Sequence, residues 1–182
     1  METDFKAVPG QIAGLWIIQM RQVSDGRGTV REFYRESAFQ AAGLPSFGAV
    51  VQINVTETNY GAVRGLHAEA MNKLVAVATG DAFGAYLDLR PDSATYGRVE
   101  TVQLVPGTQV LVPSGVANGF QATAPGVTQY LYAFNTEWQP GMPGKAANPL
   151  DPGINIEWPV PIDRENRAQI SEKDAAIGDT MF

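Results

Sequence analysis

The sequence predicts an all-β fold in a single domain spanning residues 1–182. Eight segments show the alternating or β-branched pattern of strands, whereas little of the chain repeats at helical spacing. Glycine and proline are frequent, with 19 and 12 residues, as expected where many short strands are joined by turns. Charged residues make up only 18% of the chain, against roughly 25% in a typical domain, which disfavours long charged helices.

The predicted strands are separated by explicit turn sequences. Ser24-Asp25-Gly26, Thr79-Gly80-Asp81 and Val105-Pro106-Gly107 are examples of such turns. Strands at this spacing indicate an antiparallel sandwich, jelly roll or barrel. In chain order, the predicted strands are Leu15–Met20, Gly28–Tyr34, Ala49–Thr56, Lys73–Thr79, Ala82–Leu89, Val99–Val105, Gln109–Val112 and Val127–Asn135.

Helical character is confined to two places, Glu36–Ala42 and the last dozen residues. Residues Gln139–Gly153 contain four prolines and three glycines, which predicts an ordered loop across the surface rather than a linker. The chain shows no internal repeat and no change of composition that would mark a domain boundary. Short helices at the periphery of the sheets are therefore expected.

The charge of the chain argues against nucleic acid as a partner. The net charge is −6, the isoelectric point is about 4.7, and no run of basic residues is present. Binding to a phosphate backbone needs clustered Lys and Arg. A small anionic ligand remains compatible with this composition, because two or three arginines in one cleft can outweigh the global charge locally.

Cysteine is absent and histidine occurs once, as His67. Disulfides, thiolate metal sites, cysteine nucleophiles and two-histidine metal sites within one chain are therefore excluded. The first ten residues lack a signal-peptide pattern, and the apolar runs are far shorter than the ~20 residues of a membrane span. We expect a cytoplasmic protein without membrane contact.

His67 ends a short predicted strand that begins after Gly61 and contains Arg64. A structural histidine would explain this residue. Alternatively, its near-neutral pKa suits a general base beside an arginine that binds an anion. Strict strand alternation places Arg64 and His67 on opposite faces. A bulge at Gly65 is needed if both side chains are to reach one pocket.

Other candidates also have structural explanations. Tyr132 shares a strand face with Tyr130 and Phe134, which a packed core would explain. Asp174 lies three residues after Ser171, as in a helix capping box. Lys73 can be a solvated strand end, and Arg27 can be exposed in the turn Asp25-Gly26-Arg27-Gly28.

The order of these residues along the chain is more specific than any one of them. In this order and context, the chain resembles the dTDP-4-dehydrorhamnose 3,5-epimerase family of sugar-nucleotide epimerases from about Arg27 to Asp174. The resemblance rests on Asp25-Gly26-Arg27-Gly28, Gln52-Ile53-Asn54, Arg64-Gly65-Leu66-His67, Lys73-Leu74-Val75, Leu87-Asp88-Leu89-Arg90, Ser93-Ala94-Thr95-Tyr96-Gly97, Val112-Pro113, Gly119-Phe120, Leu131-Tyr132, Asp151-Pro152, Ile156-Glu157-Trp158-Pro159 and Ser171-Glu172-Lys173-Asp174.

This resemblance implies a cupin-type jelly roll that works without metal or organic cofactor. It also implies a homodimer in which strands are exchanged between subunits. The implied substrate is a nucleoside-diphospho-4-keto-6-deoxy sugar, most simply dTDP-4-keto-6-deoxyglucose, and the implied reaction inverts C3 and C5. A base removes the proton next to the ketone, and an acid returns one from the opposite face.

The resemblance also implies a role for each site residue. His67 would be the base, Asp174 its partner, Lys73 the stabiliser of the enolate oxygen and Tyr132 the opposing acid. The residues implied to bind substrate are Arg27 and Arg64 at the diphosphate, Gln52, Asn54 and Asn118 along the pocket, and Glu32 near the nucleoside.

Of the departures from the typical family pattern, which also include Thr29 in place of an aromatic residue and a shorter segment between His67 and Lys73, two stand out. Asn118 stands where the family has histidine, and Gly84 stands where it has aspartate. We hypothesise that the usual pair is in contact and was exchanged as a unit. Two alternatives remain open: a mono-epimerase that acts at C3 or C5 only, and a cupin that binds a sugar nucleotide without catalysis.

Overall fold

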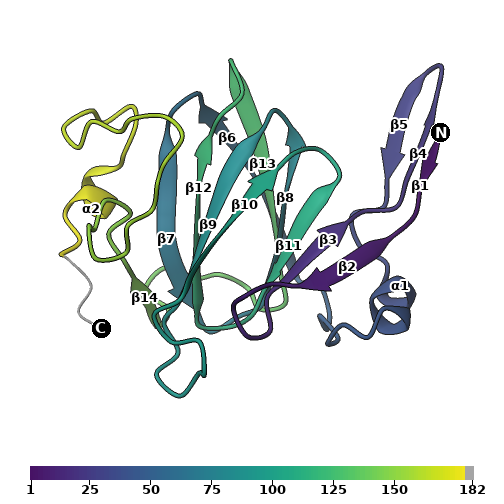
Figure 1. The fold of residues 1–182 in the computed structure, drawn as a ribbon, viewed down its shortest axis with the longest axis horizontal. Helices are drawn as coiled ribbons and strands as arrows, with labels where there is room; N and C mark the ends of the chain where they lie inside the picture. The colour runs from purple at the N-terminus through teal and green to yellow at the C-terminus, as the bar shows by residue number, and fades with distance from the viewer. Residues whose placement is uncertain (179–182) are drawn as a thin grey trace.

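The structure, a computed structural model, describes residues 1–178 and consists mainly of antiparallel strands (Figure 1). A five-stranded and a six-stranded sheet face each other. The first has the order β10 (Val99–Leu104), β9 (Ala82–Asp88), β12 (Val116–Ala122), β7 (Val63–Glu69), β14 (Gly144–Ala146). The second has the order β2 (Lys6–Pro9), β3 (Trp16–Gln19), β11 (Thr108–Val112), β8 (Lys73–Thr79), β13 (Val127–Phe134), β6 (Gln52–Asn59). The all-β prediction is confirmed.

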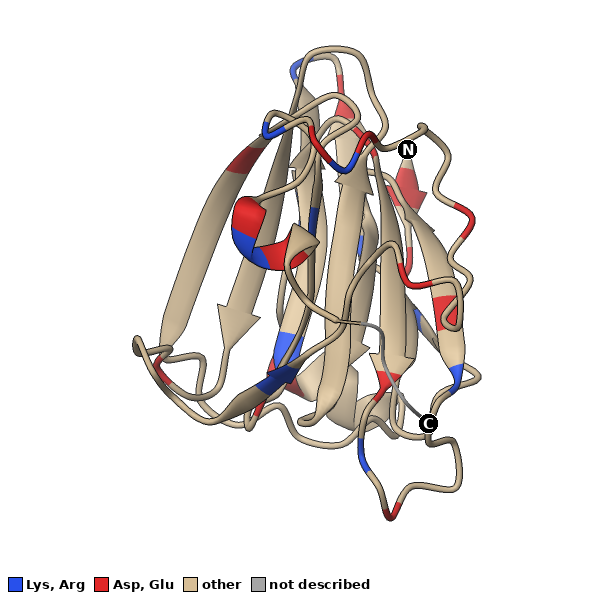
Figure 2. Ribbon diagram, turned by 90° about the vertical axis from the view of Figure 1, so that its left-hand side faces the viewer, with Lys and Arg blue, Asp and Glu red and all other residues tan. Residues whose placement is uncertain are grey.

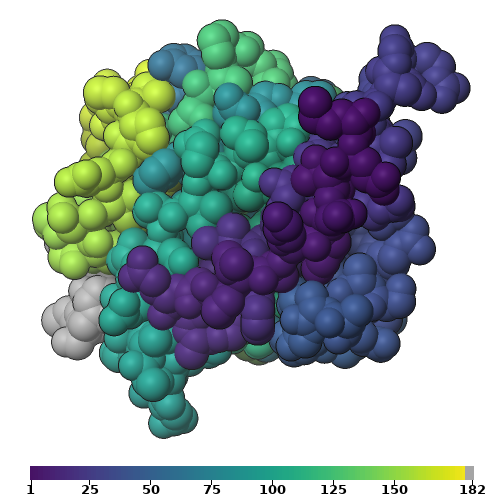
Figure 3. Space-filling view, turned by 45° about the vertical axis from the view of Figure 1, so that its right-hand side comes forward, coloured from purple at the N-terminus to yellow at the C-terminus, as the bar shows by residue number. Residues whose placement is uncertain are grey.

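A third, smaller sheet stands apart from these two. It pairs β1 (Glu2–Thr3), β4 (Gln22–Asp25) and β5 (Gly28–Arg31). The hairpin of β4 and β5 projects from the body of the molecule, as the blue-purple lobe at the upper right of Figure 3 shows. Gly26 and Arg27 form its two-residue turn, as the sequence predicts.

The main core lies between the two large sheets. Tyr86 and Phe120 reach it from the five-stranded sheet, and Val75, Val110 and Tyr130 reach it from the other. All five side chains are fully buried. The rings of Phe120 and Tyr130 stack with their centroids 3.8 Å apart. This contact joins β12 of the five-stranded sheet to β13 of the six-stranded sheet.

All eight predicted strands are present with small differences at their ends, but the sequence analysis missed β12. Its Asn118-Gly119 pair is a typical turn signal, yet every residue of β12 is buried at the centre of the five-stranded sheet. The short strands β1, β2 and β4 were missed as well. The prediction of a loop over Gln139–Gly153 was also incomplete, because β14 lies in it and pairs with β7.

The two helices are short and peripheral. Helix α1 (Glu36–Ala41) agrees with the prediction, whereas α2 covers only Glu172–Ala175 of the expected terminal helix. Residues 179–182 of that expected helix lie outside the described residues. In Figure 2, α2 lies in front of the strands, with acidic and basic residues side by side. Neither helix in residues 1–178 is long or apolar enough to cross a membrane.

Candidate active site

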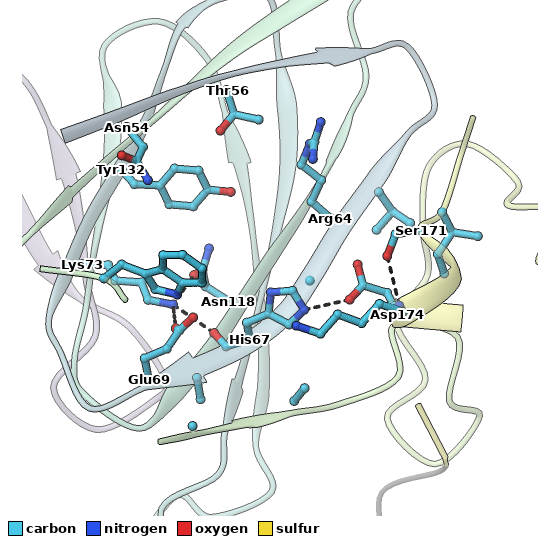
Figure 4. A pocket seen from close by; sticks show the side chains of 18 of the residues that line it. Asn54, Thr56, Arg64, His67, Glu69, Lys73, Asn118, Tyr132, Ser171 and Asp174 are labelled. Carbon is cyan, nitrogen blue, oxygen red and sulfur yellow. Dashed lines mark hydrogen bonds and ion pairs between the residues drawn. The ribbon is translucent and has the colours of Figure 1, made fainter. Parts of the chain in front are cut away.

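A cavity of about 790 Å³ opens between β6, β7, β8, β13 and α2 (Figure 4). Its wall contains the only histidine of the chain and both charged and aromatic side chains. Seven of the predicted site residues line it: Asn54, Arg64, His67, Lys73, Asn118, Tyr132 and, from α2, Asp174. Residues separated by more than 100 positions in the sequence therefore meet in one cavity.

A β-bulge in β7 brings Arg64 and His67 to the same cavity. His67 pairs with Asn118 on β12 and Arg64 pairs with Phe120, so three steps on β7 match two on β12. The extra residue reverses the alternation, and the predicted bulge at Gly65 is confirmed. Gly65 has a φ of +114°, and a Cβ on it would lie 2.5 Å from the Cα of Gly119. Only glycine fits at this crossing of β7 and β12.

His67 is paired with Asp174. The distance between His67 Nε2 and Asp174 Oδ1 is 2.7 Å. The Asp174 side chain is 7% exposed and the His67 side chain 36%, so the carboxylate is covered while the ring faces the cavity. When the carboxylate accepts a hydrogen bond from Nε2–H, the lone pair of the neutral ring lies on Nδ1. The arrangement therefore presents Nδ1 as a base.

The start of α2 holds Asp174 in place. The Ser171 side chain is the N-cap and accepts a hydrogen bond from the Asp174 backbone N–H at 3.0 Å. The predicted cap is thus present, and the Asp174 carboxylate is free to reach His67. Burial alone would raise the pKa of Asp174, but the hydrogen bond and charge of His67 outweigh it and hold this pKa below its usual value. Asp174 stays ionised at neutral pH.

Lys73 is almost completely buried, with 6% of its side chain exposed. Its Nζ donates to the backbone carbonyl of His67 at 3.0 Å, to Asn118 Oδ1 at 3.1 Å and to the Glu69 carboxylate. It begins β8, next to the carbonyl of the proposed base. Burial lowers the pKa of Lys73, and the Glu69 charge partly offsets this effect.

Tyr132 and Arg64 occupy the other side of the cavity. Figure 4 shows the Tyr132 hydroxyl pointing into the open space between Arg64 and His67. Burial raises the pKa of the hydroxyl, so it is protonated at neutral pH. Arg64 Nε donates to Thr58 Oγ1 at 2.9 Å, which fixes the stem of the guanidinium. Tyr132 also packs against the main core, so this residue both contributes to the core and lines the cavity.

The structure does not bring every predicted residue to the cavity of its own chain. The side chain of Arg27 is 91% exposed at the tip of the β4–β5 hairpin, where it pairs with Asp25. Glu32 binds Arg21 and Arg35 instead. Gln52 lies just outside the cavity and donates to Asn54 Oδ1 at 3.0 Å. The roles of these residues in binding remain predictions.

Position 84 has a clear structural reason to be glycine. A Cβ on Gly84 would lie 2.8 Å from the hydroxyl oxygen of Tyr86, which fills that space. Tyr86 pairs with Asn118 across β9 and β12. The two positions that depart from the family pattern are therefore close neighbours on adjacent strands.

Sequence reasoning missed several residues of the cavity wall. Glu69 is the clearest case: it follows His67 by two positions, so strand alternation alone places it on the same face. Three basic residues of the wall were also given no role: Lys145 and Arg167, from segments without a motif, and Lys173, from the Ser171–Asp174 motif. In residues 1–178, no three His, Asp or Glu side chains lie together as metal ligands would.

Comparison with known proteins identifies the family. The family model described as dTDP-4-dehydrorhamnose 3,5-epimerase matches residues 9–180. The chain belongs to this family. A dTDP-4-dehydrorhamnose 3,5-epimerase of Methanothermobacter thermautotrophicus is 32% identical, over 94% of this chain and 92% of that protein. The chain is therefore an enzyme of the isomerase class, as the sequence analysis expects.

Two further relatives extend the comparison. The crystal structure of a dTDP-6-deoxy-D-glucose-3,5-epimerase from Legionella pneumophila, in complex with dTDP-4-keto-L-rhamnose, has a TM-score of 0.84 and 29% identity. The matched region covers 96% of this chain and 92% of the Legionella pneumophila chain. A dTDP-4-dehydro-6-deoxyglucose 3-epimerase of Streptomyces bikiniensis is 30% identical, over 85% of this chain and 81% of that protein. The family's cupin-type jelly roll is confirmed.

Proposed function

We propose that this protein epimerises C3 and C5 of a nucleoside-diphospho-4-keto-6-deoxy sugar, most simply dTDP-4-keto-6-deoxyglucose, without a cofactor. The single observation that carries the proposal is the placement of His67 and Tyr132 in one cavity, with a proton acceptor and a proton donor facing the same open space. A reaction that inverts a carbon next to a ketone needs both groups, one on each face of the sugar.

In this mechanism, His67 Nδ1 removes the proton from the carbon beside the ketone. Asp174 holds the ring through Nε2 and stabilises the imidazolium that forms. The electron pair of the broken C–H bond moves to the ketone oxygen and gives an enolate. The buried ammonium of Lys73 stabilises this negative charge in a region of low dielectric. Tyr132 then returns a proton to the carbon from the opposite face.

The arginine and the two asparagines that line the cavity would bind the substrate. Arg64 would hold the diphosphate, because a guanidinium matches paired phosphate oxygens. Asn54 and Asn118 would donate to or accept from the sugar and its linkage. The complex of the Legionella pneumophila enzyme with dTDP-4-keto-L-rhamnose supports a sugar nucleotide as the ligand class.

We also propose a homodimer in which the partner supplies Arg27, Glu32 and the N-terminal hairpin. Two features support this assembly. The hairpin projects from its own subunit with Arg27 at its tip. The edge strand β6 exposes Ile53 and Val55, at 57% and 59%, and an open strand edge of this kind is normally covered. A cytoplasmic location fits an acidic, cysteine-free chain of this family.

A mono-epimerase is the second candidate function. The chain is 30% identical to a 3-epimerase of Streptomyces bikiniensis, which is the same identity as to some 3,5-epimerases, such as that of Salmonella typhimurium. Sequence identity therefore supports both candidates. Proton NMR of dTDP-4-keto-6-deoxyglucose in heavy water separates the candidates. Loss of both the C3 and C5 proton signals after adding the enzyme is expected. Loss of one signal identifies a mono-epimerase, and no loss with dTDP, GDP, UDP or CDP sugars identifies a binding protein.

A further inference from the structure

Glu69 is a buried carboxylate in the cavity wall that the proposed mechanism leaves unused. It is the last residue of β7, and its side chain is only 15% exposed. Its carboxylate accepts a hydrogen bond from Lys73 Nζ, as the dashed line in Figure 4 shows. Burying a carboxylate costs free energy unless a charged partner compensates it. The burial of the Glu69 carboxylate, which costs free energy, therefore suggests that this side chain has a function in the cavity.

The surroundings of Lys73 require its charged form. Three oxygens accept hydrogen bonds from Nζ: the Glu69 carboxylate, the His67 carbonyl and Asn118 Oδ1. An ammonium has three N–H donors, whereas a neutral amine has two donors and a lone pair. The three acceptors therefore match the ammonium alone. Of the three, only Glu69 carries a charge.

We propose that Glu69 is a positioning residue that keeps Lys73 protonated and fixed beside the carbonyl of His67. The inference rests on the proposed function, in which the Lys73 charge stabilises the enolate. Glu69 has an opposing effect too, because its own negative charge disfavours a nearby enolate. The Lys73–Glu69 pair therefore stabilises the enolate better than Lys73 alone only if Lys73 would lose its proton without Glu69.

Burial and the Glu69 charge have opposite effects on the pKa of Lys73. Desolvation lowers the pKa of Lys73, and the charge and hydrogen bond of Glu69 raise it again. The same carboxylate adds to the effect of burial in raising the pKa of Tyr132, which keeps this hydroxyl a proton donor. The remaining titratable and charged groups of the cavity are Arg64 and His67 on β7, Tyr132 on β13, Lys145 on β14, Arg167, and Lys173 and Asp174 on α2.

The first test measures the protonation of Lys73 directly. The chain has four lysines, so NMR of protein labelled with carbon-13 at the lysine Cε gives four signals, and a Lys73→Arg variant assigns the relevant one. In Glu69→Gln, we expect the titration midpoint of Lys73 to fall by about one pH unit or more. The exposed Glu157→Gln is the matched control and should leave it unchanged. An unchanged midpoint in Glu69→Gln overturns the proposal.

The second test measures turnover against pH. At pH 6, Glu69→Gln should keep most of the wild-type kcat, because Lys73 is still protonated. At a pH above both titration midpoints measured in the first test, kcat should be about tenfold lower than in the wild type, with little change in KM, because a midpoint lower by one unit leaves about ten times less protonated lysine there. An equal loss at every pH would indicate a structural role and overturn the proposal. If the wild-type protein itself has no turnover, the proposed function fails, while the NMR titration still decides the role of Glu69.

Discussion

His67 Nε2 and Asp174 Oδ1 lie 2.7 Å apart, although 107 positions separate the two residues in the chain. The strand β7 supplies the ring and the first turn of α2 supplies the carboxylate. This pairing defines which ring nitrogen is free to act as a base. Several expectations about activity and stability depend on it or on the residues around it.

Replacing His67 with Asn should abolish hydrogen exchange at both carbons. We expect kcat to fall by about 10²–10⁴-fold, the usual contribution of a general base. Tyr132→Phe should lose inversion more than exchange, because the base still acts while the opposing donor is missing. Proton NMR in heavy water measures both effects in one experiment. Full turnover of the His67→Asn variant would show that the base is assigned wrongly.

Replacing Asp174 with Asn should lower kcat by about 10²-fold while the fold persists. An amide neither fixes the Nε2–H tautomer nor stabilises the imidazolium. The comparison variant is Ser171→Ala, which removes only the cap and should cost about 1 kcal/mol of stability. Steady-state kinetics and thermal unfolding together separate the two effects. Equal kcat in Asp174→Asn and wild type would rule out this role for the carboxylate.

Gly119→Ala should destabilise the protein by about 3 kcal/mol and disrupt the cavity. A Cβ at this position would lie 2.7 Å from both the Arg64 carbonyl and a Leu66 methyl group. The bulge that turns Arg64 and His67 to one cavity cannot form at that distance. Gly26→Ala, with nothing within 4 Å of its Cβ, should change stability by less than about 0.5 kcal/mol. Urea denaturation measures both variants.

Asp88 should make stability depend on pH in the acid range. It is fully buried and accepts hydrogen bonds from Arg90, Ser93 and Thr95. Burial opposes its charge, but these bonds outweigh burial and hold its pKa well below the ordinary value. Because the folded-state pKa lies below the unfolded value of about 3.9, its contribution is present above pH ~4 and lost as the pH falls further.

The matching variant is Asp88→Asn. It should be about 3 kcal/mol less stable than wild type at pH 7, since it leaves the Arg90 charge without its partner. The difference should shrink as the pH is lowered below ~4. Urea denaturation across pH 3–7 tests this expectation, and a gap that stays constant with pH would contradict it.

Arg27 should act on the active site of the partner subunit. Arg27→Ala and His67→Asn should each be nearly inactive alone. When the two variants are unfolded together and refolded, half of the dimers are mixed, and one of the two sites in each mixed dimer has both native residues. About a quarter of wild-type activity should therefore return. No recovery, with dimers present by light scattering, would place Arg27 outside the shared site.

The fold could be predicted because its local signals agree with its tertiary contacts. Strand β8 contains Val75, Val77 and Thr79 and is joined through the Gly80 turn to β9, which contains Phe83 and Tyr86, and both strands are present. The sequence analysis did not predict β12, whose Asn118-Gly119 pair favours turns, because burial in a central strand overrides this local preference. The bulge at Gly65 could be anticipated from alternation alone, since Arg64 and His67 would otherwise diverge.

The site was only partly predictable from the sequence. Motif order pointed to His67, Lys73, Tyr132 and Asp174, and the cavity brings them together. Glu69 was assigned no role from the sequence, because its buried contact with Lys73 can be recognised only in the structure. Arg27 lies outside the cavity of its own chain, and its role in the proposed dimer stays a prediction.

The short helix α2 gives the active site a local stability of its own. It has four residues and packs through Ala175 against Val63 and Ile170, and few side chains hold it: the Ser171 cap, His67 at Asp174 and Arg164 at the Ala175 carbonyl. An element this small opens at a lower free energy than the sheets beneath it. Warming should therefore separate Asp174 from His67 while the jelly roll is still intact. Thermal inactivation would then precede the loss of sheet structure, and a ligand that bridges cavity and helix would protect activity more than it raises the global melting temperature.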